Sequence, residues 1–372
     1  MKLADADRKK LPALLDQLAG AVEDLLLTGL TTASDATRQT LQVAFQEASR
    51  MRLLRLSSTL RVANEELGRF TRNQADFSRR RLCFFLGRAW LLSRGLAKAL
   101  GEKDEEASDR LLWLPASQPV ERIDVVTLGV AKKVSAGAFA AFEFRLRVVA
   151  AAGQLEQGQR LTWSCVFPLK PGQEVPAEAF LHLPQKQKFK SSIFLDRKVL
   201  TIEKAAVALD GSGNGRISLL EESTVAAGDA VADWQALLGW DVAAARERIG
   251  QQRPGPLDLE VELQEEIVLE GWSIDKPAER ADEQQLVYPI VQGETAFEAR
   301  VSSSAEGKAA RKRLDELVKK KKRPPLFALM HYERCRLVLQ PLTVFGKEGP
   351  EYLPLSDEAI DKKALLQTMK FT

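Results

Sequence analysis

The segment from Val120 to Pro168 constrains the fold more than any other, because apolar and polar residues alternate along it with a period of two. Within Phe139–Val149, one face would carry Phe142, Phe144, Leu146 and Val148, and the other Glu143, Arg145 and Arg147. This period is typical of a half-buried strand. Glu121–Val134 and Arg160–Phe167 also read as strands, and the turns between the three are too short for parallel crossovers. The segment therefore predicts a three-stranded antiparallel meander.

A helical pattern of about a hundred residues precedes this meander. Leucines recur at spacings of three and four within Lys9–Leu27 and within a long stretch from Ser34, and a third helix, rich in aromatic residues and leucine, is predicted over Gln74–Leu100. In the second stretch they form a seam of Leu53, Leu56, Leu60, Ala63, Leu67 and Phe70, which is too short for an extended coiled coil. We therefore expect antiparallel helices in a bundle.

The fold class predicted is α+β, with an N-terminal helical bundle followed by a mainly antiparallel β domain with short inserted helices. The bundle would cover residues 1–101, a charged linker residues 102–119, and the β-rich domain residues 120–372. In the last part, the pattern predicts strands at Leu257–Leu269, Phe297–Val301 and Leu326–Phe345, the last broken at Pro341. It also predicts a helix from Glu306 to Lys322 and a final helix from Ser356 to Met369.

The composition is that of a globular protein, with 45% hydrophobic and 28% charged residues among 372. Three distant cysteines supply neither a disulfide framework nor a CxxC metal motif, which favours a reducing compartment. The N-terminus lacks the pattern of a signal peptide, and the most apolar run, Leu82–Leu92, is shorter than the roughly 20 residues of a membrane span. We expect a cytoplasmic protein that does not enter a membrane.

The small net charge of +3 hides large opposed blocks. Residues 38–98 contain 13 Lys and Arg against 4 Asp and Glu, residues 251–307 contain 4 against 13, and residues 308–323 contain 9 against 2. Arg50, Arg61 and Arg72 recur every eleven residues, close to three helical turns, and Arg79, Arg80 and Arg81 follow as a cluster.

These arginines have two interpretations. They form a candidate surface for a nucleic-acid backbone or another partner, or they are a solvated helix face paired with the acidic strand region 258–270. The second interpretation is favoured, because charged outer faces are usual on helices. The run Lys319–Arg323 is likewise interpreted as a solvated helix end, where positive charge suits the helix dipole.

One local motif has the spacing of a calcium loop. In Asp210–Glu221, oxygen-bearing side chains stand at Asp210, Ser212, Asn214 and Glu221, with a glycine at the sharp turn. The segment resembles the calcium loop of the EF-hand family, which implies weak calcium binding because only two of these residues are carboxylates. The favoured alternative is a glycine-rich hairpin turn, for which the same residue types are usual.

The sequence contains no nucleotide-binding, hydrolase or zinc-protease signature. His331 and Cys335 would share one strand face as a nucleophilic pair, but a buried thiol beside a structural histidine is the favoured interpretation. We assign no catalytic residues, no metal site and no cofactor. The function expected is that of a non-enzymatic binding or scaffold protein acting through protein-protein contacts. The alternatives are sequence-nonspecific nucleic-acid binding through the arginine-rich helices 50–94 and weak calcium binding at residues 210–221.

Overall fold

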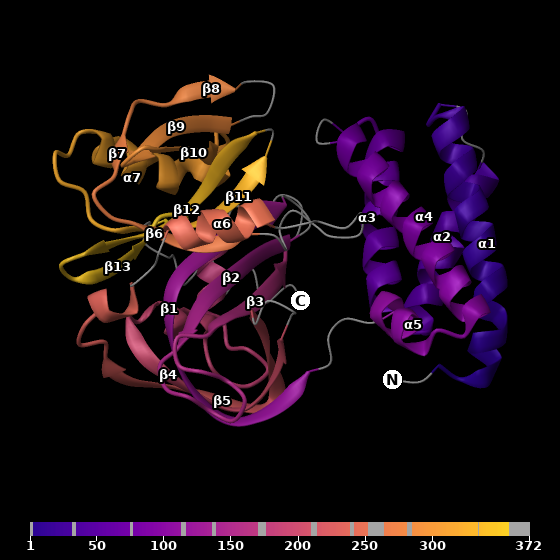
Figure 1. Cartoon of the computed structure of the whole chain (residues 1–372), viewed down its shortest axis with the longest axis horizontal. Coiled ribbons are helices and arrows are strands. Elements are labelled where there is room, and N and C mark those ends of the chain that lie inside the picture. Colours follow the sequence, from indigo (N-terminus) through magenta and orange to yellow (C-terminus); the bar gives the residue numbers. More distant parts are fainter. Residues whose placement is uncertain are drawn as a thin grey trace. The chain divides into compact units, whose positions relative to one another are not determined.

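The computed structural model divides into two compact units, an N-terminal helical unit and a β-rich unit that begins at Ser117 (Figure 1). It describes residues 3–31, 35–74, 77–112, 117–135, 139–169, 176–209, 214–238, 242–251, 264–280, 285–333 and 335–356. No helix among these residues is long and apolar enough to cross a membrane. The predicted α+β class, with helices first and the sheets after them, is confirmed.

The helical unit contains α1 (Asp5–Thr28), α2 (Asp35–Arg50), α3 (Leu54–Thr71), α4 (Arg79–Glu102) and α5 (Glu105–Leu112). The leucines at spacings of three and four face inward, as predicted: Leu11, Leu15 and Leu18 are fully buried. The seam of α3 is buried from Leu53 to Leu67. The helices therefore pack as a bundle around one apolar core.

Two expectations for this unit change. The long second helix breaks at Met51–Leu53, where Arg52 adopts a left-handed φ of 57°, so α2 and α3 are separate helices. The stretch predicted as a linker contains α5, and Leu112 at its end is buried in the bundle core. Its charges lie on the outer face of a short helix, which sequence composition alone does not distinguish from a linker.

The first sheet of the β-rich unit is a closed barrel with strand order β1-β2-β3-β5-β4. Its strands are β1 (Gln118–Ser135), β2 (Phe139–Val148), β3 (Arg160–Pro168), β4 (Lys198–Leu209) and β5 (Gly215–Ala230). The antiparallel pairing of β1 with β2 and of β2 with β3 confirms the predicted meander. Two short 3-10 helices, η1 (Ala177–His182) and η2 (Ser191–Leu195), lie between β3 and β4.

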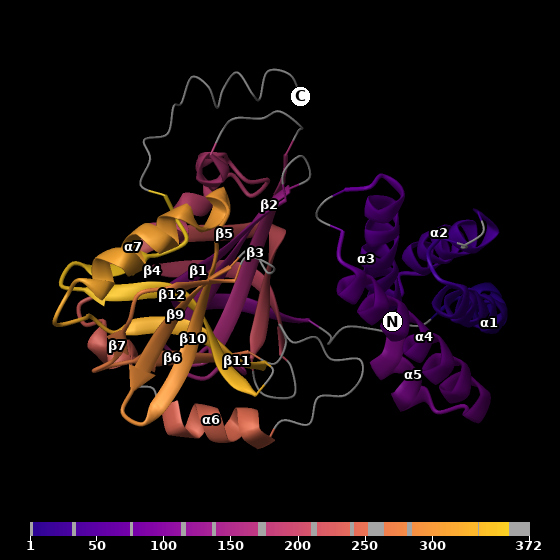
Figure 2. The ribbon, with the colours of Figure 1, turned by 90° about the horizontal axis from the view of Figure 1, so that it is seen from above.

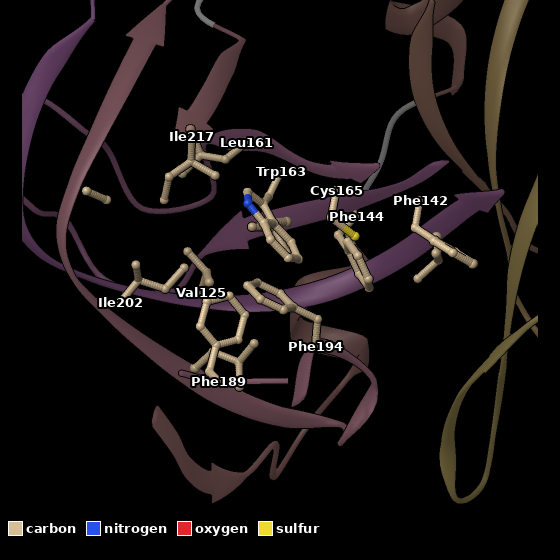
Figure 3. Close-up of a cluster of buried hydrophobic side chains, with 14 of the residues drawn as sticks. Val125, Phe142, Phe144, Leu161, Trp163, Cys165, Phe189, Phe194, Ile202 and Ile217 are labelled. Atoms are coloured by element: carbon tan, nitrogen blue, oxygen red, sulfur yellow. The ribbon is translucent and has the colours of Figure 1, made fainter. Parts of the chain in front are cut away.

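Aromatic rings fill this barrel (Figure 3). Trp163 stacks on Phe194 with ring centroids 4.4 Å apart and on Phe144 at 5.2 Å, and Phe189 completes the cluster. Phe144 comes from β2 and Trp163 from β3, whereas Phe189 and Phe194 come from the connection before β4. This connection therefore contributes two of the rings that fill the barrel interior. The aromatic cluster forms part of the hydrophobic core of the first sheet.

Strand β1 contributes side chains to two hydrophobic cores. Ile123 and Val125 point into the barrel, while Val126 and Leu128 pack on residues of the second sheet. A register shift between Thr127 and Gly129 then reverses the alternation, so that Val130 points into the barrel again. This explains why both faces of β1 are apolar in the sequence.

The second sheet has eight strands: β6 (Glu265–Leu269), β7 (Ser273–Ile274), β8 (Ala278–Arg280), β9 (Gln285–Gln292), β10 (Thr295–Ser302), β11 (Leu326–Glu333), β12 (Arg336–Gly346) and β13 (Gly349–Tyr352). Strands β6 and β7 stand at the two ends of the order β6-β11-β12-β10-β9-β7. They are also consecutive in the chain, so this sheet curls back on itself through one interrupted strand.

The two sheets thus share one topology. If β6 and β7 are counted as one strand, the second sheet repeats the order of the first, and β10 runs parallel to β12 as β3 does to β5. A five-stranded Greek-key barrel of this kind has the architecture of the OB fold. Helix α7 (Lys308–Val318) occupies the connection between β10 and β11, and α6 (Val242–Gln251) packs on β6 (Figure 2).

The structure differs from some predictions for this unit, and other predicted segments lie outside the described residues. The predicted break at Pro341 is wrong, because Pro341 lies within β12 and pairs with Ala328 next to a register shift. The chain turns earlier, between β11 and β12. Within the strand predicted over Leu257–Leu269, β6 covers Glu265–Leu269, and its Glu265 and Glu266 are buried. Most of the predicted helix 356–369, and residues 252–263 of the preceding acidic segment, lie outside the described residues.

Candidate functional site

The arginines of the predicted surface are divided among α2, α3 and α4, and Arg50, Arg61 and Arg81 pair with carboxylates of the same bundle. The guanidinium of Arg50 donates to Asp7 at 2.7 Å and to Glu47 at 2.9 Å, and these carboxylates raise the pKa of Arg50. Arg61 donates to Glu65 at 2.8 Å. Because α2 ends at Arg50, the eleven-residue spacing does not produce one continuous stripe along a helix.

The cluster after Arg72 is partly tied to one buried group. Arg81 donates to Glu66 at 2.8 Å, and Arg72, Arg79, Arg80 and Arg81 are all exposed. The partners of Arg50, Arg61 and Arg81 therefore lie in the bundle and not in the acidic segment. Whether the exposed arginines of this cluster bind a partner stays a prediction.

The segment that resembles a calcium loop joins two paired strands. Strand β4 pairs with β5 up to Leu209 and Gly215, so the flanks are strands and not the helices of an EF-hand. Asp210 and Ser212 lie outside the described residues, Asn214 directly precedes β5, and Glu221 is exposed within that strand. Among the residues that the structure describes, no three His, Cys, Asp or Glu side chains gather as a metal site would require.

Cys335 lies in the turn after β11 with a left-handed φ of 63°, so it does not share a strand face with His331. His331 instead lies with its Nε2 3.7 Å from the carboxylate of Glu333. Cys335 is exposed, contrary to the expected buried thiol, and the cysteine that fits that expectation is Cys165.

Thiol reactivity should separate the three cysteines. Burial raises the pKa of Cys165 to about 11, against 9.0 for a free thiol, so its thiolate fraction is about a hundredfold lower at neutral pH. Cys83 and Cys335 are exposed. Titration of the folded chain with a chromogenic disulfide should give two fast thiols, and the third should react after unfolding in denaturant. Three fast thiols in the folded chain would contradict the burial of Cys165.

The strongest unneutralised charge in the described residues follows α7. Ala310, Leu314 and Leu317 bury one face of this helix against the second sheet. Lys312 on the opposite face and Lys319, Lys320, Lys321 and Lys322 after the helix are all exposed. We call these five residues the lysine surface. None of them makes an ion pair with any residue that the structure describes.

The other cations near α7 have partners and hold the segment in place. Arg313 forms an ion pair with Glu351 of β13 at 2.7 Å, and Arg311 donates to the carbonyls of Ser303 and Ser304. Arg323 donates to the carbonyl of Leu317 at 3.1 Å and lies over the ring of Trp272, with 5.9 Å between its guanidinium carbon and the ring centroid. The arginines therefore anchor both ends of the segment, and the lysines are left to face the solvent.

No protein-family model matches the sequence, and the search of curated proteins finds no relative. Solved structures with partial likeness include one described as "Structural mimicry for functional antagonism", with a TM-score of 0.31 and 11% identity over 60% of this chain and 91% of that one. Another is described as "Structure of murine DNA binding protein bound with ds DNA", with a TM-score of 0.27 and 9% identity over 60% of this chain and 93% of that one. TM-scores this low do not establish that these structures share a fold or a function with this chain.

Proposed function

We propose that the chain is a non-enzymatic binding protein whose β-rich unit holds the phosphate backbone of a nucleic acid on the lysine surface. The observation that carries the proposal is the exposure of Lys312 and Lys319–Lys322 without ion pairs to described residues. Lysines that neutralise backbone phosphates release condensed counterions, which drives association without regard to base sequence. This surface differs from the arginine-rich helices that the sequence suggested.

The barrel architecture supports the proposal only by analogy. OB folds commonly bind oligonucleotides, but a fold by itself does not define a function. Base stacking needs exposed aromatic rings, and the exposed large hydrophobic side chains of the described β-rich unit include one ring, Tyr332 on β11. We therefore expect contacts to phosphates and little preference for base sequence.

The test is fluorescence anisotropy of labelled single- and double-stranded DNA and RNA, titrated with the chain across a range of salt concentrations. If all five lysines contact phosphates, the logarithm of the association constant should fall with the logarithm of salt concentration with a slope of about −4.5 on duplex DNA. Lys319→Glu/Lys321→Glu should weaken binding by at least about tenfold, since it removes two phosphate contacts and adds two repulsive charges.

The matched control is Lys9→Glu/Lys10→Glu, which makes the same charge change at exposed positions of α1. Binding should stay within about twofold of the unmodified chain if the lysine surface is the contact. If Arg79→Glu/Arg80→Glu abolishes binding and the Lys319→Glu/Lys321→Glu variant does not, the contact lies on the bundle. No binding at low salt would refute nucleic-acid binding altogether.

A protein partner, the function that the sequence analysis put first, is the second candidate. Strand β3 pairs with β5 only at Leu161 and Thr162, and beyond this point its edge has no strand partner among the described residues. A pocket of about 310 Å³ separates the two edges, and Val166 beside it is 62% exposed. An open edge with an exposed apolar residue is suited to strand addition by another polypeptide. This candidate takes precedence if nucleic acids do not bind.

A further inference from the structure

A pocket of about 490 Å³ lies between the first barrel, α6 and β6. Its lining includes Arg147 and Arg160 from the barrel, Ala236 and Ala244 from the segment around η3 (Gln235–Leu237) and α6, Arg248 from α6, and Glu266 from β6. Because these three regions are distant in sequence, the pocket exists only when the β-rich unit is folded. Its volume lies in the range of small-molecule sites, about 300–1,000 Å³.

Three arginines and two glutamates of the described residues meet at this pocket. Arg147 donates to Glu266 at 2.6 Å, and both Arg160 and Arg248 donate to the same oxygen of Glu265, at 2.8 and 3.2 Å. Among the described residues, each of the three guanidinium groups therefore has a carboxylate partner. Two of the three converge on one oxygen atom, which places two cations where a single anionic group can reach both.

The three arginines differ in how firmly they are held. The side chain of Arg147 is 3% exposed, that of Arg160 23% and that of Arg248 48%. Arg147 also donates to the carbonyl of Gly158, so it is fixed at the floor of the pocket. An ion pair at the rim contributes little to stability, so Arg248 can exchange Glu265 for a ligand oxygen at small cost.

The pocket also has an apolar wall. Val148, Ala236, Leu237 and Ala244 line it, and the alanines leave room for a bulky group. A ligand that fits would combine one anionic group near Arg160 and Arg248 with an uncharged organic body against this wall.

We propose that this pocket binds a phosphodiester, with the phosphate between Arg160 and Arg248 and the organic body against Ala236, Leu237 and Ala244. A phosphodiester carries one negative charge, whereas a phosphomonoester carries close to two and would be repelled more strongly by the Glu265 and Glu266 carboxylates. Its two free oxygens diverge, so each can accept from a different guanidinium group. The proposal does not rest on the lysine surface, whose residues do not line this pocket.

The experiment is a calorimetric titration of the full chain with 3′,5′-cyclic AMP, a small phosphodiester, and with AMP as the monoester for comparison. Cyclic AMP should bind saturably and more tightly than AMP. Arg248→Ala should weaken its binding by at least about tenfold, because it removes one of the two converging guanidinium groups. Arg246→Ala, two positions away on α6 and hydrogen-bonded outside the pocket to Thr295, should change the affinity by less than about twofold.

Two sources of the phosphodiester are distinguished by competition. If the natural ligand is a strand, a short oligothymidylate should displace cyclic AMP, and Arg248→Ala should weaken oligonucleotide binding. If it is a small nucleotide, the oligonucleotide should not compete. Lys319→Glu/Lys321→Glu should leave cyclic AMP binding unchanged in either case, so failure of the lysine surface and failure of this pocket are separate results. The proposal is overturned if cyclic AMP gives no saturable heat, if benzoate or AMP binds as tightly, or if Arg248→Ala binds unchanged.

Discussion

Glu66→Ala is expected to destabilise the helical bundle by about 3–5 kcal/mol, since breaking a buried ion-pair network leaves uncompensated polar groups. The Glu66 side chain is fully buried and accepts hydrogen bonds from Arg69 and Arg81 and from the backbone N–H of Ser78. Ser78 is the N-cap of α4, so one carboxylate ties α3 to the start of α4. Chemical unfolding of the bundle, followed by far-ultraviolet circular dichroism, measures the loss.

The neighbouring residue supplies the control. Glu65 pairs with Arg61 on the outer face of α3 at 2.8 Å, and its side chain is 44% exposed. Glu65→Ala should therefore cost less than about 1 kcal/mol. Equal effects of the two variants would show that the burial of Glu66 adds nothing to the stability of the bundle.

Glu266→Ala is expected to destabilise the β-rich unit by about 3–5 kcal/mol, because it leaves the buried guanidinium of Arg147 without its counter-charge. The two side chains are 3% and 5% exposed and link β2 of the first barrel to β6 of the second sheet. Burial lowers the pKa of Arg147 and Glu266 opposes that shift, so removal of Glu266 exposes the full desolvation cost. Tryptophan fluorescence during urea unfolding, measured in a Trp90→Phe/Trp113→Phe background, reports on this unit, to which Trp163, Trp234, Trp240 and Trp272 belong.

Replacing both partners should restore most of the loss. The double variant Arg147→Met/Glu266→Leu keeps the side-chain volume and removes both charges, and such exchanges are often close to neutral. If the double variant is as unstable as Glu266→Ala, the cost comes from packing rather than from the uncompensated charge.

The sequence predicted those helices and strands whose buried face follows from the spacing of their own apolar residues. The period of two in Phe139–Val149 identified β2 and its buried face, and the leucine spacing identified the bundle. The break between α2 and α3 escaped prediction, because it depends on the left-handed conformation of Arg52, which no glycine or proline marks. The repeated strand order also escaped prediction, because it consists of pairings between distant segments such as Val125 with Leu200.

The candidate sites likewise include one that the local sequence predicts and one that depends on contacts between distant segments. The exposure of Lys319–Lys322 follows from a run of four lysines at a helix end, which the sequence displays directly. The burial of Glu265 and Glu266 depends on Arg147, Arg160 and Arg248, which lie far away in the chain. Only the folded β-rich unit brings these groups together, so the pocket beside them had no local signature.

The order of the two units along the chain has a consequence for synthesis. Helices close through local contacts, so the bundle is able to fold soon after it leaves the ribosome. The first barrel cannot close until β5 has followed β1, from Gln118 to Ala230, which takes on the order of ten seconds at typical translation rates. In the first part of that interval, before Phe189 and Phe194 have been made, these two rings do not yet cover Phe142, Phe144 and Trp163. We therefore expect the nascent chain to be most prone to aggregation while its first barrel is still being made.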